Sequence, residues 1–182
     1  MRISGGEFKG QVFHPKADHW PTRPTTEISR EALFNILTNV LDFEACHYLD
    51  LFGGTGAHCF EMLSRGCRSL VYVDLYKPAV QFVRQTLKQM QMDSCVQLHQ
   101  MDYKKYIQTS HSTFDYIFAG PPYPLKEIPE IPDLIFQYQL LKTNGIFVLE
   151  HHQAHRFETH PRFWQLRTYG QTHFSFFNQK EL

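Results

Sequence analysis

The stretch that decides the fold is residues 50–56, which read DLFGGTG. It overlaps a short apolar run at residues 48–52 that reads as a strand, and it leads into residues 57–65, which read as a helix. In an open α/β sheet, ligands bind beyond the carboxyl ends of the strands, at turns of this kind. Glycines let the backbone approach a ligand closely, and the N-terminus of the following helix favours a carboxylate or phosphate.

Strands and helices alternate on both sides of this turn. A first helix is expected after Pro24, capped by Thr25 or Thr26. Further strands are predicted at residues 69–74, 96–101, 114–118 and 146–149, and further helices at residues 78–90 and 133–141. The tail, residues 164–170 and 173–177, reads as a β-hairpin that inserts an antiparallel strand at the sheet edge. This order predicts a doubly wound, mostly parallel sheet covered by helices on both faces.

Composition indicates one globular domain with an N-terminal arm. The chain has 182 residues, of which 42% are hydrophobic and 20% are charged, so a core can form. Lys and Arg total 18 and equal Asp and Glu, but residues 1–30 carry five cations against three anions. We expect a basic arm at residues 1–24, folded as a β-hairpin around Gly5, Gly6 and Gly10, and a domain at residues 25–182. No apolar run reaches the ~18 residues of a membrane span, and the N-terminus lacks a secretory apolar region, which predicts a cytoplasmic chain without a membrane partner.

Three carboxylates close successive predicted strands. Asp50, Asp74 and Asp102 are expected at one edge of the sheet, where Asp74 can accept both hydroxyls of a ribose and Asp102 the amino group of adenine. A dinucleotide fingerprint would need a glycine where Cys59 stands, and no Lys-Ser/Thr pair follows the glycines to make a P-loop. The pattern therefore favours an adenosine pocket over a nicotinamide or triphosphate site.

The turn after the fourth predicted strand, residues 118–124, reads FAGPPYP. Pro121 and Pro122 fix φ, remove two amide donors and leave carbonyl oxygens in set directions. Beside the ring of Tyr123, these acceptors suit a planar base with an exocyclic amine, because the ring can stack on the base. With its protons accepted, the amine nitrogen can attack an electrophilic methyl group.

Through these motifs, the chain resembles the bacterial small-subunit (16S) rRNA guanine-N2 methyltransferases, which use S-adenosylmethionine (SAM). The segments that carry the resemblance are RISGG at 2–6, KG at 9–10, RPTT at 23–26, EALFNIL at 31–37, DLFGGTG at 50–56, Glu61, SRG at 64–66, Asp74, PPY at 121–123, EH at 150–151 and YG at 169–170. The SAM-pocket segment is shared by many methyltransferases. The segments at 23–26 and 31–37 are more specific to this family.

The resemblance implies a Rossmann-like SAM-dependent methyltransferase fold of seven strands, the last of them antiparallel. It implies methyl transfer to N2 of one guanine in small-subunit rRNA or in an assembling 30S particle. A monomer is the default expectation. The residues expected to hold SAM are Asp50, Phe52, Gly53, Gly54, Gly56, Asp74, Leu75, Asp102 and Tyr103. The first part of the turn would surround the methionine end of SAM, and Gly120, Pro121, Pro122 and Tyr123 would frame the target base. Arg2, Lys9 and Arg23 would meet RNA phosphates.

Gly120 departs from the family pattern, Asp/Asn-Pro-Pro-Phe/Tyr, and so lacks a side-chain acceptor for the amine. Losing one aligned polar group typically costs roughly 2–4 kcal/mol of transition-state stabilisation, which predicts a slow enzyme. Two alternatives stay open: a DNA or protein amine methyltransferase, and a non-catalytic SAM-binding ribosome-assembly factor. No metal is predicted, because Glu150, His151 and the nearby histidines match no strong zinc spacing.

Overall fold

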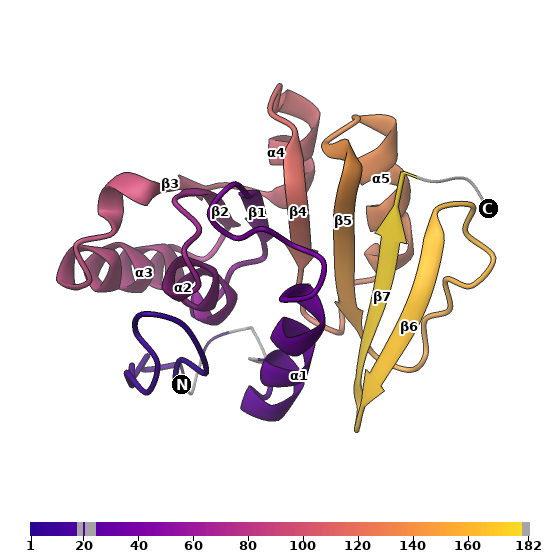
Figure 1. Ribbon diagram of the computed structural model, residues 1–182. Coiled ribbons are helices and arrows are strands. Elements are labelled where there is room, and N and C mark those ends of the chain that lie inside the picture. The colour runs from indigo at the N-terminus through magenta and orange to yellow at the C-terminus, as the bar shows by residue number, and fades with distance from the viewer. Residues whose placement is uncertain (18–19, 21–24, 180–182) are drawn as a thin grey trace.

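The computed structural model describes residues 1–17, 20 and 25–179, and these contain one seven-stranded sheet in the order β3-β2-β1-β4-β5-β7-β6 (Figure 1). The strands are β1 His47–Leu51, β2 Ser69–Asp74, β3 Val96–Gln100, β4 Phe114–Ala119, β5 Leu141–His151, β6 Phe163–Tyr169 and β7 Thr172–Asn178. Strands β1 to β5 pair in parallel, and β7 pairs antiparallel with both β5 and β6. The predicted Rossmann-like fold with an antiparallel last strand is confirmed.

The helices cover both faces of the sheet. One face packs against α1 Glu27–Leu37, α2 Ala57–Ser64 and α3 Lys77–Gln89, and the other against α4 Tyr103–Thr109 and α5 Ile131–Gln137. Two short 3-10 turns lie at Asp93–Cys95 and Ile128–Glu130. Strands buried on both faces read as continuous apolar runs, which is why β1, β2 and β4 were visible in the sequence. None of the helices in the described ranges is long and apolar enough to cross a membrane.

Three elements differ from the sequence prediction. The helix predicted at residues 133–141 ends at Gln137, because Gln139 adopts φ +52° and the chain turns into β5 at Leu141, earlier than the predicted residues 146–149. Strand β5 starts early because Leu141 pairs with Phe114 before a register shift in the ladder. Helix α4 was not predicted, since its seven residues are too few to show a clear period.

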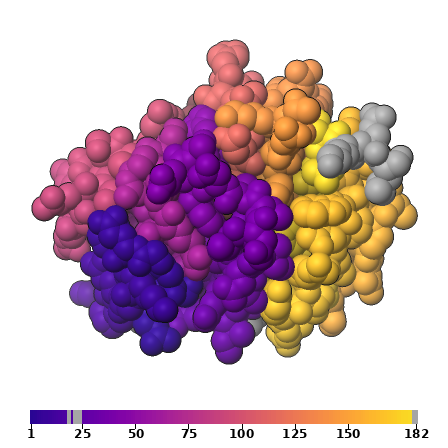
Figure 2. Space-filling model, viewed as in Figure 1, coloured from indigo at the N-terminus to yellow at the C-terminus, as the bar shows by residue number. Residues whose placement is uncertain are grey.

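The N-terminal arm packs on α2 rather than projecting from the body, and its indigo surface joins that of the following segments in Figure 2. Its two ends pair through a single antiparallel bridge, Arg2 with Val12, so the expected hairpin is limited to this short pairing. Ile3 and Phe13 are buried in the main core. Gly6, at φ +76°, lies so close to the end of α2 that a Cβ there would sit 1.8 Å from a backbone carbonyl oxygen. Residues 18–19 and 21–24 of the predicted arm lie outside the described residues.

A buried carboxylate joins the arm, α1 and α2. Glu61 is fully buried and accepts hydrogen bonds from the backbone and hydroxyl of Ser4, at 2.9 and 2.6 Å, and from Arg65 at 3.0 Å. Arg30, also buried, pairs with Glu61 at 3.9 Å and donates to the carbonyl oxygen of Arg2. Removing one partner of a buried ion pair is strongly destabilising, because the other charge then stays buried without compensation.

We predict that Glu61→Ala lowers the free energy of unfolding by about 3–5 kcal/mol, because it leaves the Arg30 charge buried without its partner. Urea unfolding followed by circular dichroism measures the loss. Glu7→Ala is the control, since Glu7 pairs with Arg68 on the surface and should cost less than about 1 kcal/mol. Equal losses for the two variants would contradict the role given to Glu61.

Candidate functional site

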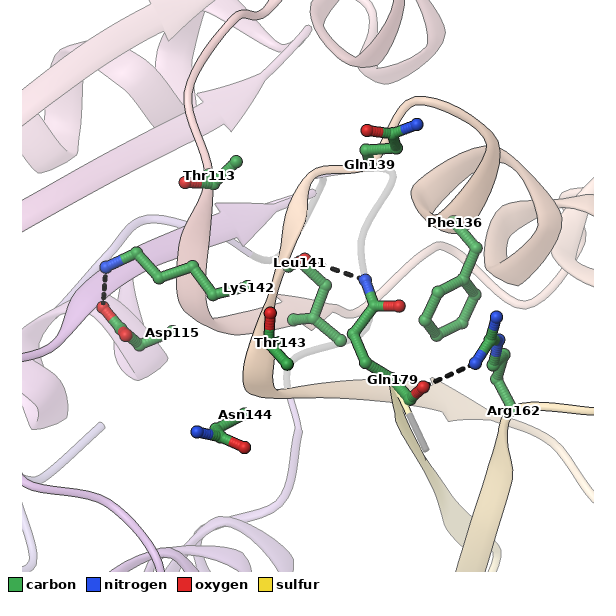
Figure 3. Close-up of a pocket in the computed structure, with 10 residues that line it drawn as sticks. All are labelled: Thr113, Asp115, Phe136, Gln139, Leu141, Lys142, Thr143, Asn144, Arg162 and Gln179. Carbon is green, nitrogen blue, oxygen red and sulfur yellow. Dashed lines mark hydrogen bonds and ion pairs between the residues drawn. The ribbon is translucent and has the colours of Figure 1, made fainter. Parts of the chain in front are cut away.

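A wide cavity of about 810 Å³ lies at the amino ends of β4 and β5 (Figure 3). It is open and polar, and its charged groups are already engaged: Lys142 pairs with Asp115 at 2.7 Å, and Arg162 donates to the carbonyl oxygen of Gln179. Ligands of open α/β sheets bind at the carboxyl ends of the strands instead. The candidate site therefore lies at the opposite edge of the sheet.

Two smaller cavities open at the carboxyl edge of the sheet. The first, about 310 Å³, is lined by Phe52, Val73, Asp74, Leu75, Tyr76, Met101, Asp102, Tyr103, Pro122 and Leu125. The second, about 40 Å³, is lined by Thr25, Asp50, Phe52, Gly53, Gly54, Thr55, Ala57, His58, Phe118 and Gly120. Phe52 lines both, so the two cavities meet at the turn after β1. We call the first the nucleoside cavity and the second the inner cavity.

The glycine turn after β1 is held tightly against β2. Gly53 donates to the carbonyl oxygen of Val73 at 3.1 Å, and a Cβ on Gly53 would lie 2.1 Å from the ring of Tyr72. The Tyr72 hydroxyl donates to the carbonyl oxygen of Gly54 at 2.7 Å. Gly56, at φ +73°, then begins α2 in a left-handed conformation that favours glycine. The turn keeps this path only with glycines, which explains the DLFGGTG sequence physically.

Asp74, the last residue of β2, fixes the turn and lines the nucleoside cavity. Its two oxygens accept from the amide of Gly54 at 2.8 Å and the amide of Tyr76 at 2.7 Å. Burial raises the pKa of this carboxyl, and the two amide hydrogen bonds oppose the shift. Each oxygen has a second lone pair, so the group can still accept from a ligand hydroxyl.

Asp102 caps α4 and also lines the nucleoside cavity. One of its oxygens accepts from the amides of Lys104 and Lys105 at 2.8 and 3.2 Å. The next residue, Tyr103, packs its ring 4.5 Å from that of Phe52, and Leu75 stands 65% exposed at the rim. The structure thus brings five of the predicted cofactor residues into one cavity whose walls are mostly apolar. A slot with apolar walls and two carboxylates at its edge suits a base joined to a ribose.

Asp50 lies in the inner cavity. It is 1% exposed, and neither carboxyl oxygen makes a hydrogen bond of good geometry with the described residues, although the Tyr48 hydroxyl and the Cys59 amide lie nearby. Burial raises its pKa to about 8, and the charge of Asp74 adds to the shift. The neighbouring Tyr48 hydroxyl and the Cys59 amide favour the charged form but offset this only partly. A buried carboxyl beside an open cavity requires a donor or a cation from a ligand.

The turn after β4 lies beside both cavities. Gly120 donates to the carbonyl oxygen of Leu51 at 3.3 Å and lines the inner cavity, while Pro122 lines the nucleoside cavity. Pro121 is buried. Tyr123 donates from its hydroxyl to Glu150, the penultimate residue of β5. Of the four residues predicted to frame the target base, Gly120 and Pro122 therefore line the two cavities.

Sequence reasoning missed three residues of this site. Glu150 accepts from the hydroxyls of Thr25 and Tyr123, and Thr25 itself lines the inner cavity. His58 stacks on Phe118 with ring centroids 3.9 Å apart, and burial lowers its pKa well below the usual range, so it is neutral. Glu150 ends an apolar run just as Asp74 does, and that signal was available in the sequence. Thr25 lies in the family-specific segment 23–26, whereas His58 carries no comparable signal.

The predicted RNA-binding residues do not reach these cavities. Arg2 and Lys9 line a separate cavity of about 320 Å³ together with Glu27 and Glu31, and Arg23 lies outside the described residues.

Along residues 1–17 and 25–179, no group of three or more metal-binding side chains comes together. His151 bonds to Ser175, while its neighbour Glu150 faces Thr25 and Tyr123.

Comparisons with known proteins agree with this fold. A family model described as "Conserved hypothetical protein 95" matches residues 1–178. The chain is 32% identical to "Putative rRNA methyltransferase YlbH" of Bacillus subtilis, covering 83% of this chain and 82% of that protein. It is 27% identical to "Ribosomal RNA small subunit methyltransferase D" of Escherichia coli K12, covering 91% and 82%.

Solved structures share the fold at low identity. The hypothetical protein TTHA0928 of Thermus thermophilus superposes with a TM-score of 0.85 at 22% identity, covering 98% of this chain and 99% of that one. An RNA methyltransferase from Salinibacter ruber, solved in complex with S-adenosyl-L-homocysteine, gives 0.65 at 15% identity, covering 85% and 92%. At these identities the likeness concerns the fold alone.

We predict that Asp50→Asn stabilises the ligand-free protein at pH 8 and changes it much less at pH 5. The raised pKa means that the folded chain keeps a proton that the unfolded chain has lost, so wild-type stability falls as pH rises from about 4 to about 8. Each pH unit of that window is worth about 1.4 kcal/mol, so the gap between variant and wild type should widen by about 3–4 kcal/mol from pH 5 to pH 8. Urea unfolding at both pH values measures it. An equal difference in the free energy of unfolding between variant and wild type at pH 5 and pH 8 would refute the burial of a protonated Asp50.

Proposed function

The chain belongs to the family described as "Conserved hypothetical protein 95", and we propose that it transfers a methyl group from SAM to the exocyclic N2 amine of a guanine in small-subunit rRNA. Relatives named as rRNA methyltransferases support methylation of rRNA. The motifs at residues 23–26, 31–37 and 121–123 support the guanine amine. The observation that carries the proposal is the buried carboxyl of Asp50 between β2 and β4, which makes no hydrogen bond of good geometry and lines the inner cavity beside the nucleoside cavity.

The residues present fit SAM. The nucleoside cavity would hold its adenosine, with Asp74 at the ribose and Asp102 near the adenine amine, and Phe52 and Tyr103 along the base. The inner cavity would hold its methionine end, where Asp50 offers a carboxylate to a positive charge. Gly53 and Gly54 allow the backbone to approach, as the close contact with Tyr72 illustrates. When bound, SAM supplies a methyl group made electrophilic by a sulfonium.

The strand order explains why the two halves of the site meet. Strand β1 lies between β2 and β4, and the chain leaves it toward β2 before returning on its other side as β4. Doubly wound sheets open a crevice at such a switch point. The turn at Gly53 and the turn at Gly120 end neighbouring strands there, so both line the inner cavity. The amine would be presented to the methyl group beside Pro121, Pro122 and Tyr123, where backbone carbonyls accept its protons.

RNA would approach over the arm. Arg2 and Lys9 of the arm are exposed and line a cavity together with residues of α1. We assign them to phosphate contacts, which would position the RNA without reading its sequence. The partner is small-subunit rRNA or the assembling 30S particle, met by a monomer in the cytoplasm. The second candidate function is a non-catalytic SAM-binding assembly factor, and Gly120 in place of a side-chain acceptor is the observation that favours it.

Mass mapping of small-subunit rRNA from cells with and without this gene tests the proposed function. We expect one N2-methylguanosine to disappear in the deletion strain and to return with the intact gene. Labelled methyl uptake by naked rRNA, assembled small subunits, duplex DNA and protein then identifies the substrate. Uptake by DNA or protein alone would refute the rRNA assignment. Binding of SAM without transfer to any of the four would favour the assembly factor.

Cofactor binding should release a proton through Asp50. A positive charge next to this carboxyl lowers its pKa from about 8, so a proton leaves when SAM binds near pH 7. Calorimetry in buffers of different ionisation enthalpy should show this release for the wild type. Asp50→Asn should weaken binding at least roughly tenfold, or about 1.4 kcal/mol, and abolish the release. Asp93→Asn, on a 3-10 turn away from the cavities, is the matched control. Proton release that persists in the Asp50 variant would assign it to another group.

A further inference from the structure

Glu150 is buried next to position 120, where the family pattern has a side-chain acceptor and this chain has glycine. Leu149 pairs with Ala119 in the parallel ladder of β4 and β5, so Glu150 and Gly120 follow next in register. Glu150 is 5% exposed, although it is a carboxylate at the end of a strand. Carboxylates are rarely this buried in proteins unless they are paired with other groups.

A side chain at position 120 would point toward this carboxylate. A Cβ built on Gly120 would lie 3.9 Å from Glu150 Oε2 and 3.2 Å from the ring of Phe118. Gly120 is not among the glycines with positive φ, so an L-residue is compatible with its backbone. An acceptor on residue 120 and the acceptor of Glu150 would therefore serve the same small volume.

Two hydroxyls contact the Glu150 carboxylate. The Thr25 hydroxyl donates to Oε2, and the Tyr123 hydroxyl donates to Oε1 at 3.3 Å. Thr25 also lines the inner cavity with Gly120 and Asp50. The two donors fix the orientation of the carboxylate beside this cavity. Thr25 and Tyr123 act here as positioning residues.

We propose that Glu150 accepts the proton of the target amine and so replaces the side chain that Gly120 lacks. This inference rests on the proposed methyl transfer to a guanine amine. The lone pair of that amine is delocalised into the base, and an acceptor on its N–H makes the nitrogen more nucleophilic. The nitrogen forms a bond to the methyl carbon while the carbon–sulfur bond breaks, and the sulfur keeps the bonding pair. The extra proton on nitrogen passes to the Glu150 carboxylate and then to water.

Single-turnover transfer from labelled SAM to small-subunit rRNA tests the role. Glu150→Ala should slow transfer by roughly 10²-fold, as deletion of one aligned polar group does in other enzymes. Glu150→Gln keeps one acceptor oxygen for one of the two hydroxyls and offers its NH2 group to the other, but it cannot take the proton, so transfer should slow about tenfold. Gly120→Asn in the Glu150→Ala background should recover at least a tenth of the wild-type rate, because its amide oxygen restores an acceptor.

Other measurements separate this role from a structural one. S-adenosylhomocysteine affinity and urea unfolding of Glu150→Gln should match the wild type, as should the transfer rate of Glu158→Gln, whose carboxylate pairs with Arg156 on the surface. With S-adenosylhomocysteine bound, the wild type should bind guanosine monophosphate more tightly than inosine monophosphate, which lacks the amine, and Glu150→Ala should remove the difference.

The possible negative results distinguish the role of Glu150 from the proposed methyl transfer. An active wild type with an equally fast Glu150→Ala variant would overturn the role of Glu150 and leave the proposed function intact. Slow transfer that Gly120→Asn does not restore, together with an unchanged nucleotide preference, would also overturn it. A wild type that transfers no methyl to any rRNA would overturn the proposed function itself.

Discussion

The parallel pairing of β1 with both β2 and β4 is the constraint on which the rest of the structure depends. It places the carboxyl ends of three strands side by side and opens the crevice between the turns at Gly53 and Gly120. Residues along β1 alternate between the two cores, with Tyr48 on the α2 side and Leu49 on the α5 side. A slip of one residue would exchange these faces and carry Asp50 away from the inner cavity, so burial on both sides fixes the register.

A second constraint ties the arm and α1 to this sheet. The buried Glu61 carboxylate binds Ser4 of the arm and pairs with Arg30 of α1, so both segments have a defined place on α2. Thr26 then caps α1, and the preceding Thr25 reaches Glu150 at the end of β5. Thr25 and Thr26, which belong to the family-specific segment 23–26, therefore link α1 to the end of β5 beside the inner cavity.

In the role that we propose for Glu150, the acceptor stands on the strand next to the one that carries it in the family pattern. Adjacent strands lie about 4.8 Å apart, so a longer side chain on one strand end can reach the volume served by a shorter one on the next. Gly120 and Glu150 stand in that relation. The motif pattern alone predicted a weakened site at Gly120, because it compares one position with the family and does not include the strand beside it.

The sequence by itself determined the central strands, the glycine turn, the closing hairpin and the cluster of Asp74 and Asp102, because these follow from apolar runs, turn residues and the common direction of parallel strands. Local pattern missed α4 and overextended α5, since seven-residue helices show little periodicity. Only the tertiary structure decided the pairing of Thr25 with Glu150, 125 residues apart, and the isolation of the Asp50 carboxyl. Both depend on which side chains packing brings together and which it seals from water, and no local stretch of sequence contains that information.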